Sequence, residues 1–246
     1  MSGSSIVSDL SNIDIVLLAG GLGIRIQAVL GDTPKLLAPV GEFTYLDLLL
    51  DWLQGFGARR VILSLGHLAD KIVTYVDEHP RAGMEIISVI EPEPMGTAGA
   101  LRFVRNQVNT DVALVMNGDS WIDADLAALC NAQAHSETAG TLLCVRVEDA
   151  GRYGKIEISD NGRIAGFFEK QPDAGHGLIN AGVYAFSKSA WDMIAASDGR
   201  SLERDIFAKQ PDCLAAFNAG DVPFIDIGTP ESLAQAASFI CAANSS

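Results

Sequence analysis

The sequence predicts an α/β fold in which a parallel sheet is covered by helices on both faces. Two observations carry this prediction: short apolar runs are bounded by Gly, Pro or polar residues, and they alternate with amphipathic stretches. Strand–helix repetition of this kind is typical of a doubly covered parallel sheet, because parallel strands need a crossover, usually a helix, between them. The apolar runs that we interpret as central strands are Ile13–Ala19, Val61–Leu65, Glu85–Ile90 and Val112–Met116.

The stretches between these runs have helical periodicity. Ala69–Asp77 and Ala98–Val108 are predicted helices. Another lies behind Thr44, which can cap it, and carries an apolar stripe at intervals of three and four residues: Leu46, Leu49, Leu50 and Leu53.

After about residue 140 the predicted strands follow one another closely, which indicates an added hairpin-rich lobe. The turn signal Asp160-Asn161-Gly162 lies between two of them. The chain then returns through helices near Lys188–Ala196 and Leu202–Lys209 and a strand at Pro223–Ile227. A last helix begins at Thr229-Pro230, where Thr caps and Pro takes the first helical position. The closely spaced strands are Thr141–Val147, Gly154–Ile158, Arg163–Phe168 and Ile179–Phe186.

Composition narrows the classes of partner. The 246 residues include 31 acidic and 17 basic side chains, a formal net charge of −14, which disfavours nonspecific nucleic-acid binding. No apolar run approaches the roughly 18–20 residues that span a bilayer, so we expect no membrane partner. Residues 1–11 lack the features of a signal peptide and are interpreted as a flexible tail before one domain over 12–246.

The four cysteines have no C-x-x-C spacing, so we expect buried free thiols in a reducing compartment, the cytoplasm. The histidines share no metal spacing, and no chemistry is assigned to them.

A glycine-rich turn follows the first predicted strand. Gly20, Gly21 and Gly23 let the backbone turn tightly enough for its N–H groups to approach a phosphate. The dinucleotide fingerprint does not fit, because Ile26 stands where its third glycine belongs, and the G-K-[ST] ending of the Walker loop is missing. A plain strand–helix turn is the alternative. Nearby, Pro34 fixes the backbone before Lys35, whose ammonium can face this loop, although an isolated lysine is more often a plain surface residue.

Two aspartates, Asp119 and Asp226, end predicted strands. In open α/β sheets, ligands bind beyond the carboxyl ends of the strands. Two carboxylates combined with phosphate oxygens suit Mg²⁺, which prefers hard oxygen ligands and keeps waters. Helix capping is an alternative for each acid taken alone, but it accounts poorly for both. The sequence therefore predicts a magnesium site at Asp119 and Asp226.

Taken in order, these motifs resemble the sugar-1-phosphate nucleotidyltransferase family from about Ile13 to Ala236. The resemblance begins with Leu18-Ala19-Gly20-Gly21-Leu22-Gly23-Ile24-Arg25 followed by Pro34-Lys35, although the family usually has Thr in place of Ile24. It implies a Rossmann-like three-layer α/β/α fold with a mixed, mainly parallel sheet and a sugar-binding lobe. It also implies that Arg25 and Lys35 neutralise the triphosphate, with Asp119 as the third catalytic residue. Residues 12–140 would then be the nucleotide-binding half and 141–225 the sugar-phosphate half.

The family's nucleobase and ribose segment is similar to residues 91–100 here, with Glu91, Gly96 and Thr97 in the matching positions. With Leu18, Ala19 and the glycine turn, these residues make the implied nucleotide site. Relatives that use pyrimidine nucleotides usually have Gln in place of Glu91. Since a carboxylate can accept both guanine N1–H and the N2 amine, Glu91 favours GTP. A solvated loop acid is the alternative, and Glu93 could equally be the exposed one.

Three further segments resemble the family's sugar side. The resemblance implies that the acid and amide bind sugar hydroxyls and that the lysine binds the sugar phosphate. Gln171 replaces the usual Pro after that lysine. Ser201-Leu202-Glu203 also matches a family segment, but a serine-capped helix start explains it without function. The implied sugar-phosphate residues are Tyr153, Gly154, Glu169, Lys170 and Asn180.

The implied reaction transfers a nucleoside monophosphate from a nucleoside triphosphate, GTP favoured, to a sugar 1-phosphate, with Mg²⁺ as cofactor and pyrophosphate as the second product. The strongest resemblance is to D-glycero-D-manno-heptose 1-phosphate guanylyltransferases. Mannose-1-phosphate guanylyltransferases and N-acetylmuramate-1-phosphate uridylyltransferases are alternatives. From other classes, a catalytically silent nucleotide-sugar sensor stays open, and a nicotinamide-dependent oxidoreductase is disfavoured by the missing glycine. The predicted partners are the two substrates, and a homodimer stays open.

Overall fold

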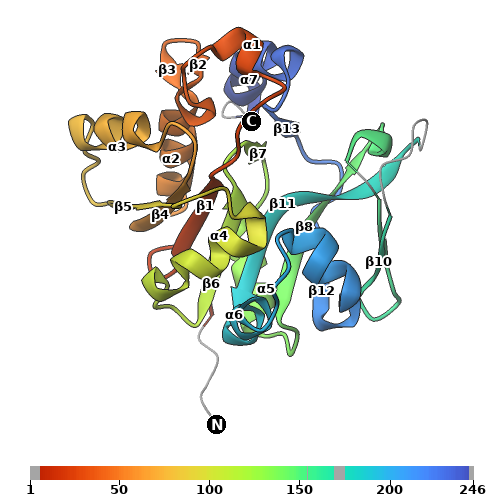
Figure 1. Cartoon of the computed structure of the whole chain (residues 1–246). Helices are drawn as coiled ribbons and strands as arrows, with labels where there is room; N and C mark the ends of the chain where they lie inside the picture. The colour runs from red at the N-terminus through yellow and green to blue at the C-terminus, as the bar shows by residue number, and fades with distance from the viewer. Residues whose placement is uncertain (1–5, 154, 169–174, 244–246) are drawn as a thin grey trace.

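A seven-stranded mixed sheet forms the centre of the protein, in the order β12-β8-β11-β6-β1-β4-β5 (Figure 1). The computed structural model describes residues 6–153, 155–168 and 175–243. Every neighbouring pair in the sheet is parallel except the two pairs made by β11. The expected mixed, mainly parallel α/β fold is therefore confirmed. The strands are β1 (Asp14–Ala19), β4 (Arg60–Leu65), β5 (Glu85–Ile90), β6 (Val112–Asn117), β8 (Gly140–Val147), β11 (Gly177–Ser187) and β12 (Leu214–Asn218).

Helices cover both faces of this sheet because its strands alternate their apolar side chains between the two faces. Ile15 and Leu17 pack with helices on one face, whereas Val16 packs into a second core on the other. The first core is formed with α2 (Tyr45–Gly55), α3 (Ala69–Glu78), α5 (Leu126–Ala134) and α7 (Pro230–Ala243), and the second with α4 (Gly96–Val104) and α6 (Lys188–Ala195).

Three short two-stranded ribbons lie outside this sheet in the described residues: β2 (Pro39–Val40) with β3 (Phe43–Thr44), β7 (Ser120–Ile122) with β13 (Phe224–Asp226), and β9 (Ile156–Ile158) with β10 (Ile164–Phe167). The helix α1 (Gln27–Leu30) lies with α7 and the β2–β3 hairpin at one end of the molecule in Figure 1. The predicted hairpin lobe is thus divided, because β9 and β10 form a separate ribbon while β8 and β11 belong to the central sheet.

Several elements were not predicted, among them the short strands β2, β3 and β7, the helix α5 and the strand β12. The helix α5 is buried on most sides and shows no clean apolar stripe. The edge strand β12 contains two alanines, which have low strand propensity. The predicted helix near Leu202–Lys209 is instead two short, irregular helical turns, Leu202–Ile206 and Phe207–Lys209.

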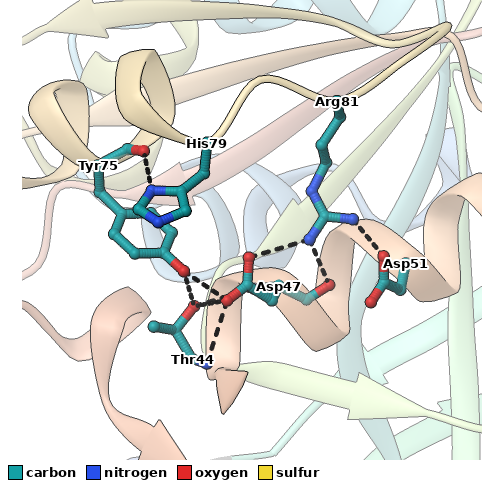
Figure 2. A network of polar contacts seen from close by, with 6 residues as sticks. All are labelled: Thr44, Asp47, Asp51, Tyr75, His79 and Arg81. Carbon is teal, nitrogen blue, oxygen red and sulfur yellow. Dashed lines mark hydrogen bonds and ion pairs between the residues drawn. The ribbon is translucent and has the colours of Figure 1, made fainter. Parts of the chain in front are cut away.

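A polar network ties α2 to α3 (Figure 2). Thr44 and Asp47 form a reciprocal capping box at the start of α2. Asp47 also accepts hydrogen bonds from Tyr75 and Arg81, and Arg81 pairs with Asp51 as well. Burial raises the pKa of Asp47, but hydrogen bonds from Thr44, Tyr75 and Arg81 outweigh it and lower that pKa below its usual value. The network fixes the position of α3, whose Ile72 lines the cavity described below.

Burial of the expected thiols is confirmed for Cys130 and Cys144, and burial raises the pKa of each to about 12. Cys213 is free and half-buried. Within the described ranges, no helix is both long enough and apolar enough to cross a membrane.

Candidate active site

A cavity of about 680 Å³ opens at the carboxyl end of β1. The predicted metal ligand Asp119 lines it, together with six of the residues predicted for the nucleotide site: Leu18, Ala19, Gly21, Gly23, Arg25 and Lys35. His67 and Leu68 line the same cavity from the loop between β4 and α3, and the sequence analysis did not identify either of them. Leu68 is the one non-glycine residue with positive φ, +58°, in the described chain, which marks this wall as a tight turn.

The glycine turn is required by close packing. A Cβ on Gly20 would lie 2.2 Å from Glu91 Oε1, and Gly23 has φ +58°. The helix that follows, α1, has only four residues. Phosphate contacts at this turn would therefore depend on loop N–H groups and nearby cations more than on a helix dipole.

Two acids and two cations converge at one side of the cavity. Asp226 pairs with Ser120 in the β7–β13 ribbon, and Ile227 N–H donates to the Asp119 carbonyl at 2.9 Å, so the ribbon brings the two acids together. Lys35 Nζ lies 2.7 Å from Asp119 Oδ2 and 3.9 Å from Asp226 Oδ1.

Arg25 completes this group beside Gly228. A Cβ built on Gly228 would lie 2.6 Å from Asp226 Oδ1, 3.0 Å from Arg25 Nη2 and 3.2 Å from Lys35 Nζ. Gly228 N–H also donates to Asp226 Oδ1 at 2.6 Å. No side chain could replace Gly228 without displacing charged groups that the sequence analysis had selected.

The electrostatics of this group suit a cation. Burial, followed by repulsion from Asp119, raises the pKa of Asp226 above its usual value, although Lys35 and Arg25 oppose the shift. Tyr45 lies fully buried, and its hydroxyl has no hydrogen-bond partner within the described residues. Burial raises the pKa of Tyr45 well above its usual value, and the charges of Asp119 and Asp226 raise it further.

This donor set fits magnesium. Mg²⁺ is commonly held by one or two carboxylates together with waters and substrate phosphates. The described residues contain no group of three or more His, Cys, Asp or Glu side chains that could hold a metal ion. Two carboxylates with an orphaned buried hydroxyl nearby therefore match an ion whose remaining ligands come from water and the nucleotide.

Glu91 is the buried acid of its loop, whereas Glu93 is exposed. Glu91 is 8% exposed and accepts hydrogen bonds from Ser64 Oγ at 3.3 Å and from Met95 N–H at 3.1 Å. Glu91 does not line the cavity itself; its carboxylate lies directly beneath Gly20. A solvated loop acid is therefore the wrong description of Glu91 and the correct one of Glu93.

The start of α4 is held by a distant segment. Gly96 has φ +72°, and Thr97 Oγ1 accepts a hydrogen bond from Leu202 N–H at 2.8 Å. Both residues are predicted to bind nucleotide. The hydrogen bond from Leu202 N–H to Thr97 Oγ1 attaches this predicted nucleotide segment to the chain near residue 202.

The sugar side is described only in part, because Gly154, Glu169 and Lys170 lie outside the described residues. Tyr153 packs edge-on against Phe224 of β13, with ring centroids 5.5 Å apart, two residues from Asp226.

Asn180 is engaged by its neighbours on the sugar side. Its Nδ2 donates to Glu203 Oε1 at 2.6 Å and to Tyr184 Oη at 2.9 Å. Ser201 does cap the following turn by accepting from Arg204 N–H, as predicted, but Glu203 has this additional contact that a capping interpretation missed.

Comparison with known proteins decides the family. A family model described as nucleotidyl transferase matches residues 14–243. The chain belongs to the nucleotidyl transferase family. The predicted class of enzyme is therefore confirmed.

Individual relatives agree with this assignment. D-glycero-alpha-D-manno-heptose 1-phosphate guanylyltransferase of Campylobacter jejuni is 32% identical over 88% of this chain and 95% of its own length. Mannose-1-phosphate guanylyltransferase of Mycobacterium tuberculosis is 31% identical over 89% of this chain, which spans 62% of that protein. The crystal structure of HddC from Yersinia pseudotuberculosis complexed with GMP-PN is similar with a TM-score of 0.79 and 32% identity, over 92% of this chain and 98% of that one.

Proposed function

We propose that the protein transfers GMP from GTP to a sugar 1-phosphate, with D-glycero-α-D-manno-heptose 1-phosphate as the favoured acceptor, and releases pyrophosphate. The observation that carries this proposal is the convergence of Arg25, Lys35, Asp119 and Asp226 beside Gly228, at one side of the cavity. Such a group has the charges that a nucleotidyl transfer needs and contains no nucleophilic Ser or Cys.

The chemistry follows from these charges. A phosphate oxygen of the sugar phosphate attacks the α-phosphorus in line with the departing pyrophosphate, and the P–O bond to the β-phosphate breaks. Positioned charges, rather than a covalent protein intermediate, accelerate such transfers. Lys35 and Arg25 would neutralise the triphosphate oxygens and stabilise the leaving pyrophosphate.

Asp119 and Asp226 would hold the magnesium ion. When bound, the ion supplies positive charge that offsets the charge of the reacting phosphates. Lys35 contacts Asp119 directly, so it also limits the repulsion between the two acids.

Glu91 would select the base. Each of its oxygens accepts one hydrogen bond within the protein and retains a lone pair for another donor. Guanine presents two adjacent donors on its Watson–Crick edge, whereas a pyrimidine carbonyl facing a carboxylate would be repelled. The heptose acceptor is supported by the first relative above, which matches this chain over nearly its full length.

Mannose 1-phosphate is the second candidate acceptor, since a mannose-1-phosphate guanylyltransferase matches 89% of this chain. We also propose a reducing, cytoplasmic environment, because buried thiols such as Cys130 and Cys144 are typical of that compartment.

The test is a matrix of GTP, UTP, CTP and dTTP against several sugar 1-phosphates, with pyrophosphate release as the readout. The expected result is release with GTP and heptose 1-phosphate, abolished in a folded Asp119→Ala variant. Nucleotide binding without release in any combination would instead identify a silent nucleotide-sugar sensor.

A further inference from the structure

A short segment after α6, which includes the start of the Leu202–Ile206 turn, contacts both predicted substrate sides. We name residues 199–203 the strap. Its first half contacts the loop that begins α4: Ala98 N–H donates to the Arg200 carbonyl at 2.9 Å, and the Arg200 guanidinium donates to the Pro94 carbonyl. Leu202 N–H donates to Thr97 Oγ1 at 2.8 Å. Three hydrogen bonds therefore attach the strap to the predicted base-binding loop.

Close packing shows how tightly these parts fit. A Cβ built on Gly96 would lie 2.5 Å from the Arg200 carbonyl oxygen, so the two backbones meet at a distance that only glycine allows. From the other side, the Arg102 guanidinium of α4 donates to the carbonyls of Ser197 at 2.7 Å and Gly199 at 2.8 Å. The strap and the start of α4 therefore form one unit.

The strap is also anchored to the core. Asp205 Oδ2 accepts hydrogen bonds from Arg200 N–H at 2.9 Å and Ser201 N–H at 2.8 Å, and the Leu202 side chain is 1% exposed. These two hydrogen bonds and the buried Leu202 side chain hold the strap in place between its two ends.

The second half of the strap reaches the predicted sugar side. Glu203 Oε1 accepts from Asn180 Nδ2 at 2.6 Å and from Tyr184 Oη at 3.1 Å. Both Nδ2 hydrogens of Asn180 are then used, on Glu203 and Tyr184, while its Oδ1 accepts from Gly182 N–H at 3.0 Å. Glu203 thus fixes which way the Asn180 amide faces.

We propose that the strap couples the two substrate sites, with Arg200 and Glu203 as positioning residues that touch neither reacting group. Nucleotide that binds at Pro94–Thr97 further restrains the end of the strap held by Arg200, and this restrains Glu203 and, through Glu203, the Asn180 amide on the sugar side. By linkage, the sugar phosphate raises nucleotide affinity by the same factor. The inference rests on the proposed function.

The experiment measures that factor by calorimetry. The dissociation constant of the α,β-methylene analogue of GTP, which cannot be cleaved at the reacting bond, is measured with Mg²⁺ in the absence and presence of saturating D-glycero-α-D-manno-heptose 1-phosphate. The wild type is expected to bind the analogue about fivefold or more tightly when the sugar phosphate is present. In Arg200→Met and in Glu203→Ala the factor is expected to fall to about one.

Arg204→Ala is the matched control, because Arg204 is the next residue along, its side chain is 73% exposed, and its ion pair is with the adjacent Asp205. It should retain the wild-type factor. Hydrogen exchange at the amides of Ala98 and Leu202 provides a second readout: sugar phosphate alone should slow it in the wild type and leave it unchanged in Glu203→Ala.

A wild-type factor of one, or a factor that persists in both Arg200→Met and Glu203→Ala, would overturn the coupling. Pyrophosphate release by the wild type, measured in parallel, reports separately on the proposed function. Coupling without any pyrophosphate release would contradict the proposed function but agree with the proposed role of the strap. Pyrophosphate release without coupling would agree with the proposed function but contradict the role of the strap.

Discussion

The substitution Glu91→Gln tests base selection with little structural cost. Glu91 accepts one hydrogen bond from Ser64 Oγ and one from Met95 N–H. A glutamine carbonyl can still accept from Met95 N–H, and its amide can donate to Ser64 Oγ, since a hydroxyl also accepts. The variant should therefore fold normally while it loses the charge and one of the two carboxylate oxygens that are proposed to accept hydrogen bonds from guanine.

The size of the effect follows from that loss. A hydrogen bond to a charged group contributes about 1.5–3 kcal/mol, and the new amide would also oppose one guanine donor. Since about 1.4 kcal/mol is a factor of ten, kcat/KM for GTP should fall by about 10- to 100-fold. The kcat/KM for UTP or dTTP should fall less than that for GTP, or rise, so the preference for GTP over these pyrimidine nucleotides should become smaller.

Steady-state pyrophosphate release with GTP and UTP, at saturating sugar 1-phosphate, measures this change. Glu93→Gln is the control, because Glu93 lies in the same loop and is exposed, so its kinetics should match the wild type. A wild type that prefers a pyrimidine nucleotide, or an unchanged GTP preference in folded Glu91→Gln, would refute the proposed readout without refuting the class of enzyme.

Three further predictions concern charge and packing. Lys35→Ala should lower kcat by about 100-fold, as expected for a charge positioned for the transition state; a rise in KM alone would show that it binds ground and transition states equally. Asp226→Asn should abolish turnover yet melt at or above the wild-type temperature in EDTA at pH 7.5. The raised pKa of Asp226 means that its charge opposes folding above that pKa, which the neutral amide side chain of the variant avoids. The variant's gain in melting temperature should therefore vanish as the pH falls through that pKa and the wild-type acid is protonated. A lower melting temperature for the variant than for the wild type at pH 7.5 would contradict this sign. A positive φ costs a non-glycine residue about 1–2 kcal/mol. Gly96→Ala should lower the free energy of unfolding by more than this amount, because the new Cβ would also meet the Arg200 carbonyl. Gly83→Ala, at φ +78° with nothing within 4 Å, should cost only the φ penalty, and equal urea midpoints for the two variants would contradict the packing argument.

Much of this protein was determined by local sequence. Periodicity located the central strands β1, β4, β5 and β6 and the helices α2, α3 and α4, since each apolar run or stripe reflects burial within one element. The Thr44 cap and the Thr229-Pro230 helix start were also predictable, because capping depends on residues within one turn of each other. Where burial was uniform, as in α5, periodicity carried no signal.

The site required the tertiary structure. Asp119 and Asp226 were each recognisable at a strand end. Only the pairing of β7 with β13 places both of them beside the ammonium group of Lys35. Nothing local distinguishes Glu91 from Glu93; the difference is that Glu91 is enclosed by Gly20 and Ser64, from other strand ends. Glu203 looked like part of a helix start because its partner, Asn180, is 23 residues away. Contacts between distant elements depend on how the sheet orders its strands, and that order is a property of the packed chain rather than of any one segment.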